Sequence, residues 1–236
     1  FFNYLKENNY EYDDISILDK LTLTDLEKYV DYLNYFIIEK DGKKVEHVNN
    51  ERGKSRKIAS LRTFYKYFYK KQRISQNPAS LLDMPKLHQK EIVRLEPDEM
   101  VKLVDIVENG NTLTKGEQKY YEKNRLRDMA IIYLLLGTGI RVSECVGIDI
   151  KNIDFNNNGI KIFRKGGNES VIFFSEEVRK ILLTYLEERK KKITEEDALF
   201  LSMQGTRITT RAVQNLVKKY SKHVTSLKNI SPHKLR

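Results

Sequence analysis

The sequence predicts a mainly α-helical protein in two parts: a small helical domain, followed by a mixed α+β domain with a small antiparallel sheet. Two patterns of apolar residues and one proline-containing interruption of the chain support this prediction. Apolar residues recur at helical spacing through most of the chain, whereas period-two patterning with β-branched residues is confined to residues 148–174. Residues 77–86 contain two prolines, which favour a joint between domains over a continuous helix.

The first domain is predicted to cover residues 1–86. Residues 22–37 begin with Thr and Asp, which suit a helix N-cap, and continue with apolar residues at helical spacing. Residues 41–55 are polar, contain glycine and lack apolar periodicity, so they are predicted to form a loop. Residues 56–74 are predicted to form a second helix that is apolar on one face and basic elsewhere.

The second domain is predicted to cover residues 96–236, after an exposed, extended linker at residues 87–95. Its polar stretch 111–124 is assigned to no element, and residues 148–174 are predicted to form an antiparallel meander of two or three strands. Its predicted helices cover residues 96–110, 125–137, 175–192 and 209–224.

The charge balance favours an anionic partner. Lys and Arg number 43 against 33 Asp and Glu, which gives a net charge of +10. An excess of this size is typical of proteins that bind nucleic acid, although a soluble protein can also be basic without binding one.

The compartment can be inferred from what the sequence lacks. Cys145 is the single cysteine, so no intrachain disulfide can form and a reducing compartment is expected. No apolar run reaches the roughly 18 residues that span a bilayer, and no signal peptide is visible. We therefore expect a cytoplasmic protein without membrane association. Because the chain begins with Phe1 and not Met, we also expect its N-terminus to be trimmed.

The stretch Gly-Thr-Gly-Ile-Arg-Val-Ser-Glu, residues 137–144, is a candidate anion site. Gly137 and Gly139 bracket the end of a predicted buried helix, and Arg141 follows at the start of the next one. An arginine held this rigidly suits bidentate recognition of a phosphate, and Glu144 could hold its guanidinium or the local backbone. Taken alone, the two residues also fit an ordinary surface ion pair on a helix.

Two further stretches could supply cations. Lys165 lies at the predicted tip of a hairpin beside two glycines, which is also where a solvated turn lysine is common. Near the end of the chain, Ser231 can cap a helix, and His233 and Arg236 then share one helical face that suits an oxyanion. The four histidines show no metal-ligand spacing, so no metal site is predicted.

Basic residues outside these stretches are predicted to contact a nucleic-acid backbone. Lys54, Arg56 and Arg62 lie in or just before the basic helix of the first domain, where they could position a duplex through its phosphates. Arg207 and Arg211, beside the last predicted helix, are candidates of the same kind. The aromatic residues of the basic helix could stack on bases, but their spacing is more simply that of a core.

The order of these signals resembles the tyrosine recombinase (integrase) family. Thr-Gly-Ile-Arg-Val-Ser-Glu, a hairpin Lys-Gly and Pro-His-Lys-Leu-Arg follow one another behind a basic helical domain. The joint Asn-Pro-Ala-Ser-Leu-Leu-Asp-Met-Pro-Lys is similar to the family's junction between its core-binding and catalytic domains. The resemblance covers nearly the whole chain and implies a SAM-like helical core-binding domain followed by the tyrosine recombinase catalytic fold.

The resemblance also implies roles for the candidate residues. Arg141 and Arg236 would grip the scissile phosphate, and Glu144 would support Arg141. Lys165 would protonate the leaving 5′-oxygen. His233 would be the histidine of the family's second sequence motif (the second box), which here also contains Arg236. The implied reaction cleaves and rejoins DNA strands through a 3′-phosphotyrosine, without cofactor or metal. The implied partners are double-stranded DNA and, for the complete protein, further copies in a tetramer; this chain alone could be monomeric.

The family's nucleophilic tyrosine follows the second arginine, but the last of the 14 tyrosines, Tyr220, precedes His233. We therefore expect a C-terminally incomplete catalytic domain that binds duplex DNA and forms no covalent adduct. The length of stretch 111–124 favours an integrase of a mobile element over a compact chromosomal member. Two alternatives stay open: a non-catalytic DNA-binding protein that retains the fold, and a basic adaptor for acidic protein or RNA.

Overall fold

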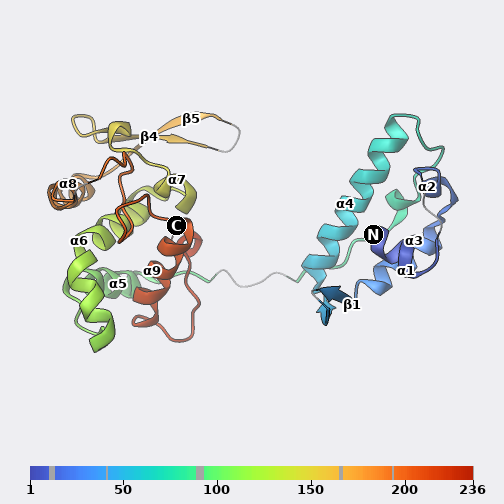
Figure 1. The fold of residues 1–236 in the computed structure, drawn as a ribbon, viewed down its shortest axis with the longest axis horizontal. Helices are drawn as coiled ribbons and strands as arrows, with labels where there is room; N and C mark the ends of the chain where they lie inside the picture. Colours follow the sequence, from blue (N-terminus) through green and yellow to red (C-terminus); the bar gives the residue numbers. More distant parts are fainter. Residues whose placement is uncertain (11–13, 41, 89–92, 165–166, 193, 236) are drawn as a thin grey trace. The chain divides into compact units, whose positions relative to one another are not determined.

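The protein is described here from a computed structural model. It describes residues 1–10, 14–40, 42–88, 93–164, 167–192 and 194–235. The chain divides into two compact units, Phe1–Lys90 and Glu91–Arg236, and each is considered by itself (Figure 1). Within the described residues, no helix combines the length and the apolar character that crossing a membrane requires.

The described residues of unit 1 form four α-helices, a two-stranded hairpin and a short 3-10 helix. Two of its helices begin at side-chain caps: Thr22 and Asp25 form a reciprocal capping box, and the Asn50 side chain accepts a hydrogen bond from the Gly53 N–H. The elements in order are α1 (Phe2–Glu7), α2 (Ile17–Lys20), α3 (Leu23–Tyr32), β1 (Tyr35–Lys40), β2 (Lys43–Val48), α4 (Glu51–Lys70) and η1 (Pro78–Leu81).

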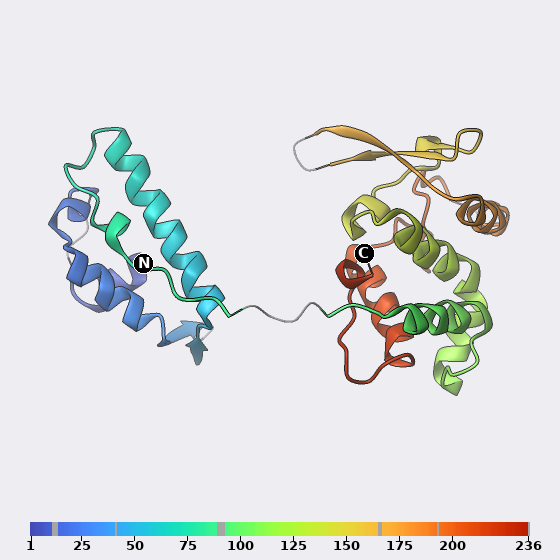
Figure 2. The same cartoon turned by 180° about the vertical axis from the view of Figure 1, so that it is seen from behind.

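The core of unit 1 lies between α4 and the shorter helices, which Figure 2 shows from behind. Ile58, Leu61 and Tyr65 of α4 are buried at helical spacing, as the sequence predicts. They form one cluster with Leu5 of α1 and Leu26 of α3. The apolar face of α4 therefore holds the unit together and leaves the opposite face of the helix exposed.

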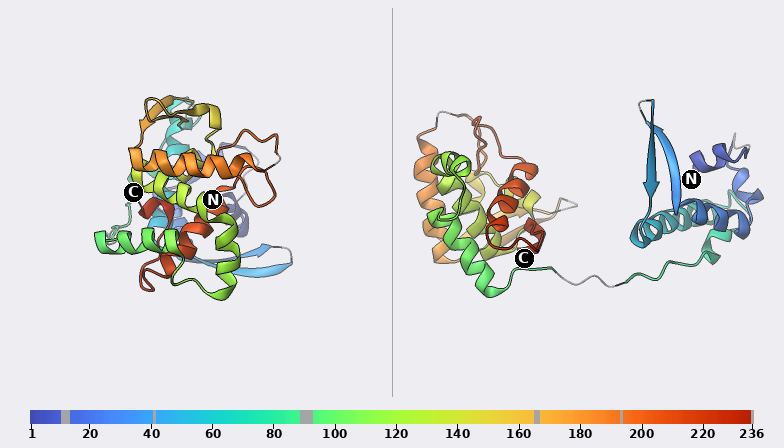
Figure 3. Two further views of the ribbon diagram at one scale, coloured as in Figure 1. Left: turned by 90° about the vertical axis from the view of Figure 1, so that its left-hand side faces the viewer. Right: turned by 90° about the horizontal axis from the view of Figure 1, so that it is seen from below.

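The β1–β2 hairpin corrects two predictions. The helix predicted over residues 22–37 ends at Tyr32, and the loop predicted over 41–55 contains β2 and the first turns of α4. The strands pair antiparallel from Tyr35↔Val48 to Lys40↔Lys43, and the hairpin projects from the helices of its unit (Figure 3). Phe36 stacks on Tyr32 with ring centroids 5.1 Å apart, so the base of the hairpin is attached to α3.

Unit 2 is a helical domain with a three-stranded antiparallel sheet in the order β3-β4-β5, which confirms the predicted meander. Its elements in order are α5 (Pro97–Asn109), α6 (Lys115–Thr138), α7 (Val142–Val146), η2 (Ile150–Asn152), β3 (Ile153–Asp154), β4 (Gly159–Phe163), β5 (Glu169–Phe173), α8 (Glu176–Lys190), α9 (Thr210–Lys222) and η3 (Pro232–Lys234).

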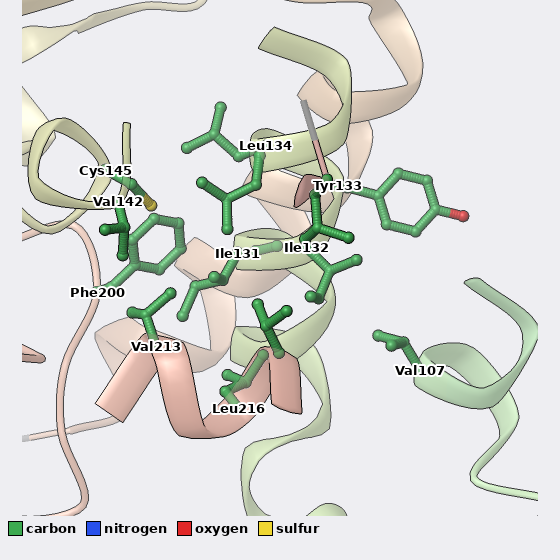
Figure 4. Packing of buried hydrophobic residues seen from close by; sticks show 14 of the residues in the cluster. Val107, Ile131, Ile132, Tyr133, Leu134, Val142, Cys145, Phe200, Val213 and Leu216 are labelled. Carbon is green, nitrogen blue, oxygen red and sulfur yellow. The ribbon is translucent and has the colours of Figure 1, made fainter. Parts of the chain in front are cut away.

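Helix α6 is the centre of unit 2. It begins at Lys115 after a capping box between Thr114 and Glu117, so most of the unassigned stretch 111–124 is its polar first half. Its second half is apolar on nearly all sides, and Figure 4 shows Ile131 and Ile132 packed among side chains from neighbouring elements. A Cβ added at Gly137 would lie 2.9 Å from Val178 of α8, so this glycine permits close packing of the two helices.

A buried carboxylate joins α6 to α9. Asp128 is 2% exposed and accepts hydrogen bonds from Arg127 Nη2 at 2.8 Å, from Tyr220 Oη at 3.0 Å and from Lys219 Nζ at 3.3 Å. Burial, with the adjacent Asp128 charge, raises the pKa of Tyr220. The position of α9 against α6 therefore depends on one fully satisfied polar cluster inside the apolar core.

Cys145 is expected to be chemically inert in the folded protein. The thiol lies in the core beside Val142 (Figure 4), and burial raises its pKa to about 12, so almost no reactive thiolate exists near neutral pH. Iodoacetamide at pH 8, followed by mass spectrometry, should leave native protein unmodified and modify it fully in denaturant. Rapid alkylation of the native protein would show that this part of the core opens readily.

Candidate functional site

Arg141 is held in place by Glu144. Helix α6 ends at Thr138, its C-cap Gly139 turns the chain with a φ of +62°, and Arg141 is the N-cap residue of α7. Glu144 Oε2 accepts a hydrogen bond from the Arg141 backbone N–H at 2.7 Å, and its Oε1 accepts one from Arg141 Nη1 at 2.9 Å. The Glu144 side chain is 5% exposed and that of Arg141 is 50% exposed. The buried Glu144 thus holds Arg141 in place, unlike the partner in an ordinary surface ion pair. The remaining N–H groups of the Arg141 guanidinium face solvent and are free to bind a ligand.

The electrostatics favour an ionised Glu144. Burial alone would raise its pKa. The hydrogen bonds from the Arg141 backbone and side chain, together with the charges of Arg141 and Arg164, outweigh burial, so the pKa is lowered. Glu144 therefore stays a carboxylate and keeps Arg141 oriented. Arg164 was not among the candidates predicted from the sequence.

His233 lies on an anchored turn. Residues Pro232–Lys234 form η3, and Ile230 and Leu235 on either side are buried in the core of unit 2, whereas His233 is exposed. The predicted Ser231 side-chain cap is absent from this turn; the Ser231 carbonyl instead accepts a hydrogen bond from the Lys234 N–H at 2.8 Å. Helix α9 contacts both η3 and α7, so His233 and Arg141 belong to neighbouring elements of one unit.

Lys165 and Arg236 lie outside the described residues, so their meeting with Arg141 and His233 stays a prediction. The structure does describe the base of the hairpin that carries position 165. The Arg164 N–H donates to the Asn168 carbonyl at 2.8 Å, and the Gly167 N–H donates to the Arg164 carbonyl at 3.1 Å. Gly167 has φ +81°, a conformation that favours glycine.

Two of the residues predicted to contact DNA form hydrogen bonds within unit 1 instead of projecting freely. Lys54 Nζ donates to the Asn34 side chain, and Arg62 donates to the carbonyls of Ser80 and Leu82.

Arg207 forms ion pairs with Asp149 at 2.6 Å and with Glu196 at 3.3 Å. Arg211, in contrast, is exposed on α9. Contact of any of these residues with DNA stays a prediction, and the bonds of Lys54, Arg62 and Arg207 to other parts of their own unit give each of them a structural role.

The exposed face of α4 carries a row of cations that the sequence prediction did not single out, apart from Arg56. We call Arg52, Arg56, Lys66 and Lys70 the basic stripe. These residues are exposed and recur at helical spacing on the side opposite the buried face. Within the described part of the chain, no carboxylate forms an ion pair with them. Helical periodicity applied to the basic residues, and not only to the apolar ones, would have identified the stripe.

The described residues contain no candidate metal-binding site. Among those residues, no group of three or more His, Cys, Asp or Glu side chains is placed to hold a metal ion. What these residues offer is the Arg141 guanidinium, held in place by Glu144, which can bind an oxyanion directly.

Comparison with known proteins decides the family. Residues 93–236 match the phage integrase family. The chain is 34% identical to the tyrosine recombinase XerC of Caldanaerobacter subterraneus subsp. tengcongensis over 226 residues, which are 94% of this chain and 57% of that protein. It is 30% identical to the tyrosine recombinase XerC of Leptospira interrogans over an alignment of 250 residues, which covers all of this chain and 76% of that protein.

The chain belongs to the tyrosine recombinase family. The sequence resemblance is thereby confirmed. The chain spans somewhat more than half the length of the first of these relatives.

Solved structures confirm the tyrosine recombinase fold. The XerH site-specific recombinase bound to palindromic difH substrate matches with a TM-score of 0.68 at 18% identity, over 99% of this chain and 62% of that one. The Tn1549 transposon integrase in complex with circular intermediate DNA matches with a TM-score of 0.63 at 20% identity, over 99% of this chain and 75% of that one.

Proposed function

We propose that the protein is a site-specific DNA recombinase that cleaves and rejoins strands of duplex DNA through a 3′-phosphotyrosine. The observation that carries the proposal is the half-exposed Arg141 guanidinium, fixed by the buried Glu144 carboxylate in a member of the tyrosine recombinase family. The relatives named above are tyrosine recombinases, and two of the structural neighbours are bound to DNA.

The geometry at Arg141 suits phosphoryl transfer. Attack on a phosphodiester increases the negative charge on the non-bridging oxygens, and donors that are already in place stabilise this charge without rearranging. Glu144 occupies Arg141 Nη1 and the backbone N–H, which fixes the plane of the guanidinium. The remaining N–H groups of Arg141 can then bind a phosphate oxygen in a defined orientation.

The other catalytic roles follow from the order of motifs in the family. We assign Arg236 to the same phosphate, Lys165 to protonation of the leaving 5′-oxygen and His233 to the second box. In the family's order of motifs, the nucleophilic tyrosine comes after the second arginine, the position that Arg236 matches. Tyr220 cannot substitute for it, because its ring is fully buried and its hydroxyl donates to Asp128.

Unit 1 supplies the binding surface in this proposal. The basic stripe presents four cations along α4, with Ala59 and Thr63 exposed between them, so a phosphate backbone can approach the helix closely. We further propose cytoplasmic action on double-stranded DNA, as a tetramer when the protein is complete and without a cofactor.

The proposal is tested with the full-length gene product and a nicked suicide duplex that carries its recombination site. A protein–DNA band that resists denaturation and is lost after substitution of the nucleophilic tyrosine is the expected result. Specific binding to the site without any covalent band would instead support the non-catalytic DNA-binding alternative.

Arg56→Ala is expected to weaken duplex binding by a similar factor at every sequence, because a phosphate contact carries no sequence information. The slope of log affinity against log salt should become shallower by about 0.9 for the lost contact. Fluorescence anisotropy between 50 and 200 mM salt measures both quantities. Lys28→Ala, on α3 outside the basic stripe, is the control and should leave the slope unchanged. An unaltered slope for Arg56→Ala would exclude this residue from the interface.

A further inference from the structure

Arg164 occupies a defined position at the end of β4. The antiparallel ladder reaches Phe163↔Glu169, and the Arg164 N–H adds one more bond to the Asn168 carbonyl at 2.8 Å. The strand alternation thus extends to Arg164 and places it on the same face of the sheet as Ile160 and Ile162.

That face of the sheet is buried in the core of unit 2. Ile160 and Ile162 are 1% and 2% exposed and share a hydrophobic cluster with Val142 of α7. The short helix η2, a few residues after α7, contacts β4 directly. An arginine two residues beyond Ile162 therefore lies at the edge of this cluster.

The charge of Arg164 is not balanced by an acid of its own. Two other cations near the sheet are paired: Lys161 Nζ lies 2.7 Å from Glu169 Oε2, and Arg179 Nη1 lies 2.9 Å from Glu176 Oε1. For Arg164, the described residues show no ion pair, and its side chain is exposed.

The positive charge of Arg164 acts on the Glu144 carboxylate and helps to lower its pKa. Both oxygens of Glu144 already accept hydrogen bonds from Arg141. The single negative charge of Glu144 thus stands against the two positive charges of Arg141 and Arg164, which leaves an excess positive charge. An excess of this kind, open to solvent, favours a bound anion.

We propose that Arg164 is a further phosphate-contacting residue, which binds the DNA backbone beside the phosphate that Arg141 holds. This inference rests on the proposed function, because it assumes that a duplex lies over Arg141. Arginine suits the position because its planar fork can bind two oxygens of one phosphate, whereas a lysine would act as a point charge.

The test compares the 236-residue chain with its Arg164→Gln variant on a duplex of fixed length. The variant should bind roughly tenfold more weakly, as expected for one lost charged hydrogen bond. Its salt slope should be shallower by about 0.9, and its melting temperature should be unchanged. Arg164→Lys should restore the slope and only part of the affinity. Lys180→Gln, at an exposed position of α8, is the matched control and should keep the wild-type slope.

The outcomes separate this inference from the proposed function. If the wild-type chain binds with a steep salt dependence and Arg164→Gln keeps the same slope, the inference is overturned and the proposed function stands. A lower melting temperature with an unaltered slope also overturns it, since Arg164 would then only balance Glu144. Wild-type protein that does not bind duplex DNA would overturn both.

Discussion

Arg141→Ala should lower the rate of DNA strand cleavage by the full-length protein about a hundredfold or more, while its affinity for duplex DNA changes by only a few-fold. The reason is that the Arg141 donors act on charge that develops in the transition state, whereas the duplex is held by many phosphate contacts elsewhere. Single-turnover cleavage of a suicide duplex, with binding measured on the same preparation, separates the two quantities.

Two variants control for the integrity of the fold at this site. Arg141→Lys keeps the charge but loses the fork, so it should bind DNA normally and still cleave slowly. Glu144→Gln should release the guanidinium from its fixed plane and give an intermediate rate. Circular dichroism melting of each variant checks that unit 2 remains folded. Normal cleavage by Arg141→Ala would show that the phosphate is held elsewhere.

Asp128→Ala should destabilise unit 2 by about 3–5 kcal/mol, the range for removing one partner of a buried charge pair. The substitution would leave Arg127 and Lys219 without their shared carboxylate and would leave the Tyr220 hydroxyl without an acceptor inside the core. Because this cluster joins α6 to α9, the contact between the two helices should weaken first.

Hydrogen exchange followed by mass spectrometry measures this effect by peptide. Peptides from α6 and α9 should lose protection in Asp128→Ala, and those from α4 should exchange as in the wild type, because α4 belongs to unit 1. Asp128→Asn is the matched control. It retains an acceptor for Tyr220 and should cost less. Equal protection in wild type and Asp128→Ala would mean that the cluster contributes little to stability.

The helices of unit 2 could be predicted because their signals are local. Ser175 and Thr209 cap α8 and α9, and the predicted starts of these helices agree with the structure within one residue. The apolar half of α6 was also recognisable, whereas its polar first half lacked apolar periodicity and depended on the cap at Thr114.

The β1–β2 hairpin could not be inferred from apolar periodicity. The run Tyr35 to Ile38 is too short to distinguish a strand from the end of a helix, and β2 is exposed along its whole length. Its position depends on Phe36, which packs on Tyr32, a contact that only the folded unit provides. The Asp-Gly pair at residues 41 and 42 is a hairpin signal that the prediction of a loop passed over.

At the candidate site, the spacing of residues in the sequence predicted that Arg141 and Glu144 form a pair, but it did not predict that Glu144 is buried. The i,i+3 relation of Arg141 and Glu144 was visible in the sequence, whereas the burial of Glu144 arises from the packing of α7 on its neighbours. The bonds of Arg62 to carbonyls some twenty residues away are tertiary and leave no local signal. Arg164 became a candidate only when the register of β4 showed which face it shares.

A crystal structure of these 236 residues with a duplex that contains the recombination site would test the central claim most directly. We expect a phosphate oxygen within hydrogen-bonding distance of the Arg141 guanidinium, about 2.7–3.2 Å, with the Glu144 contact unchanged and the basic stripe facing the backbone. A duplex bound on another surface, with Arg141 open to solvent, would contradict the assignment of this site.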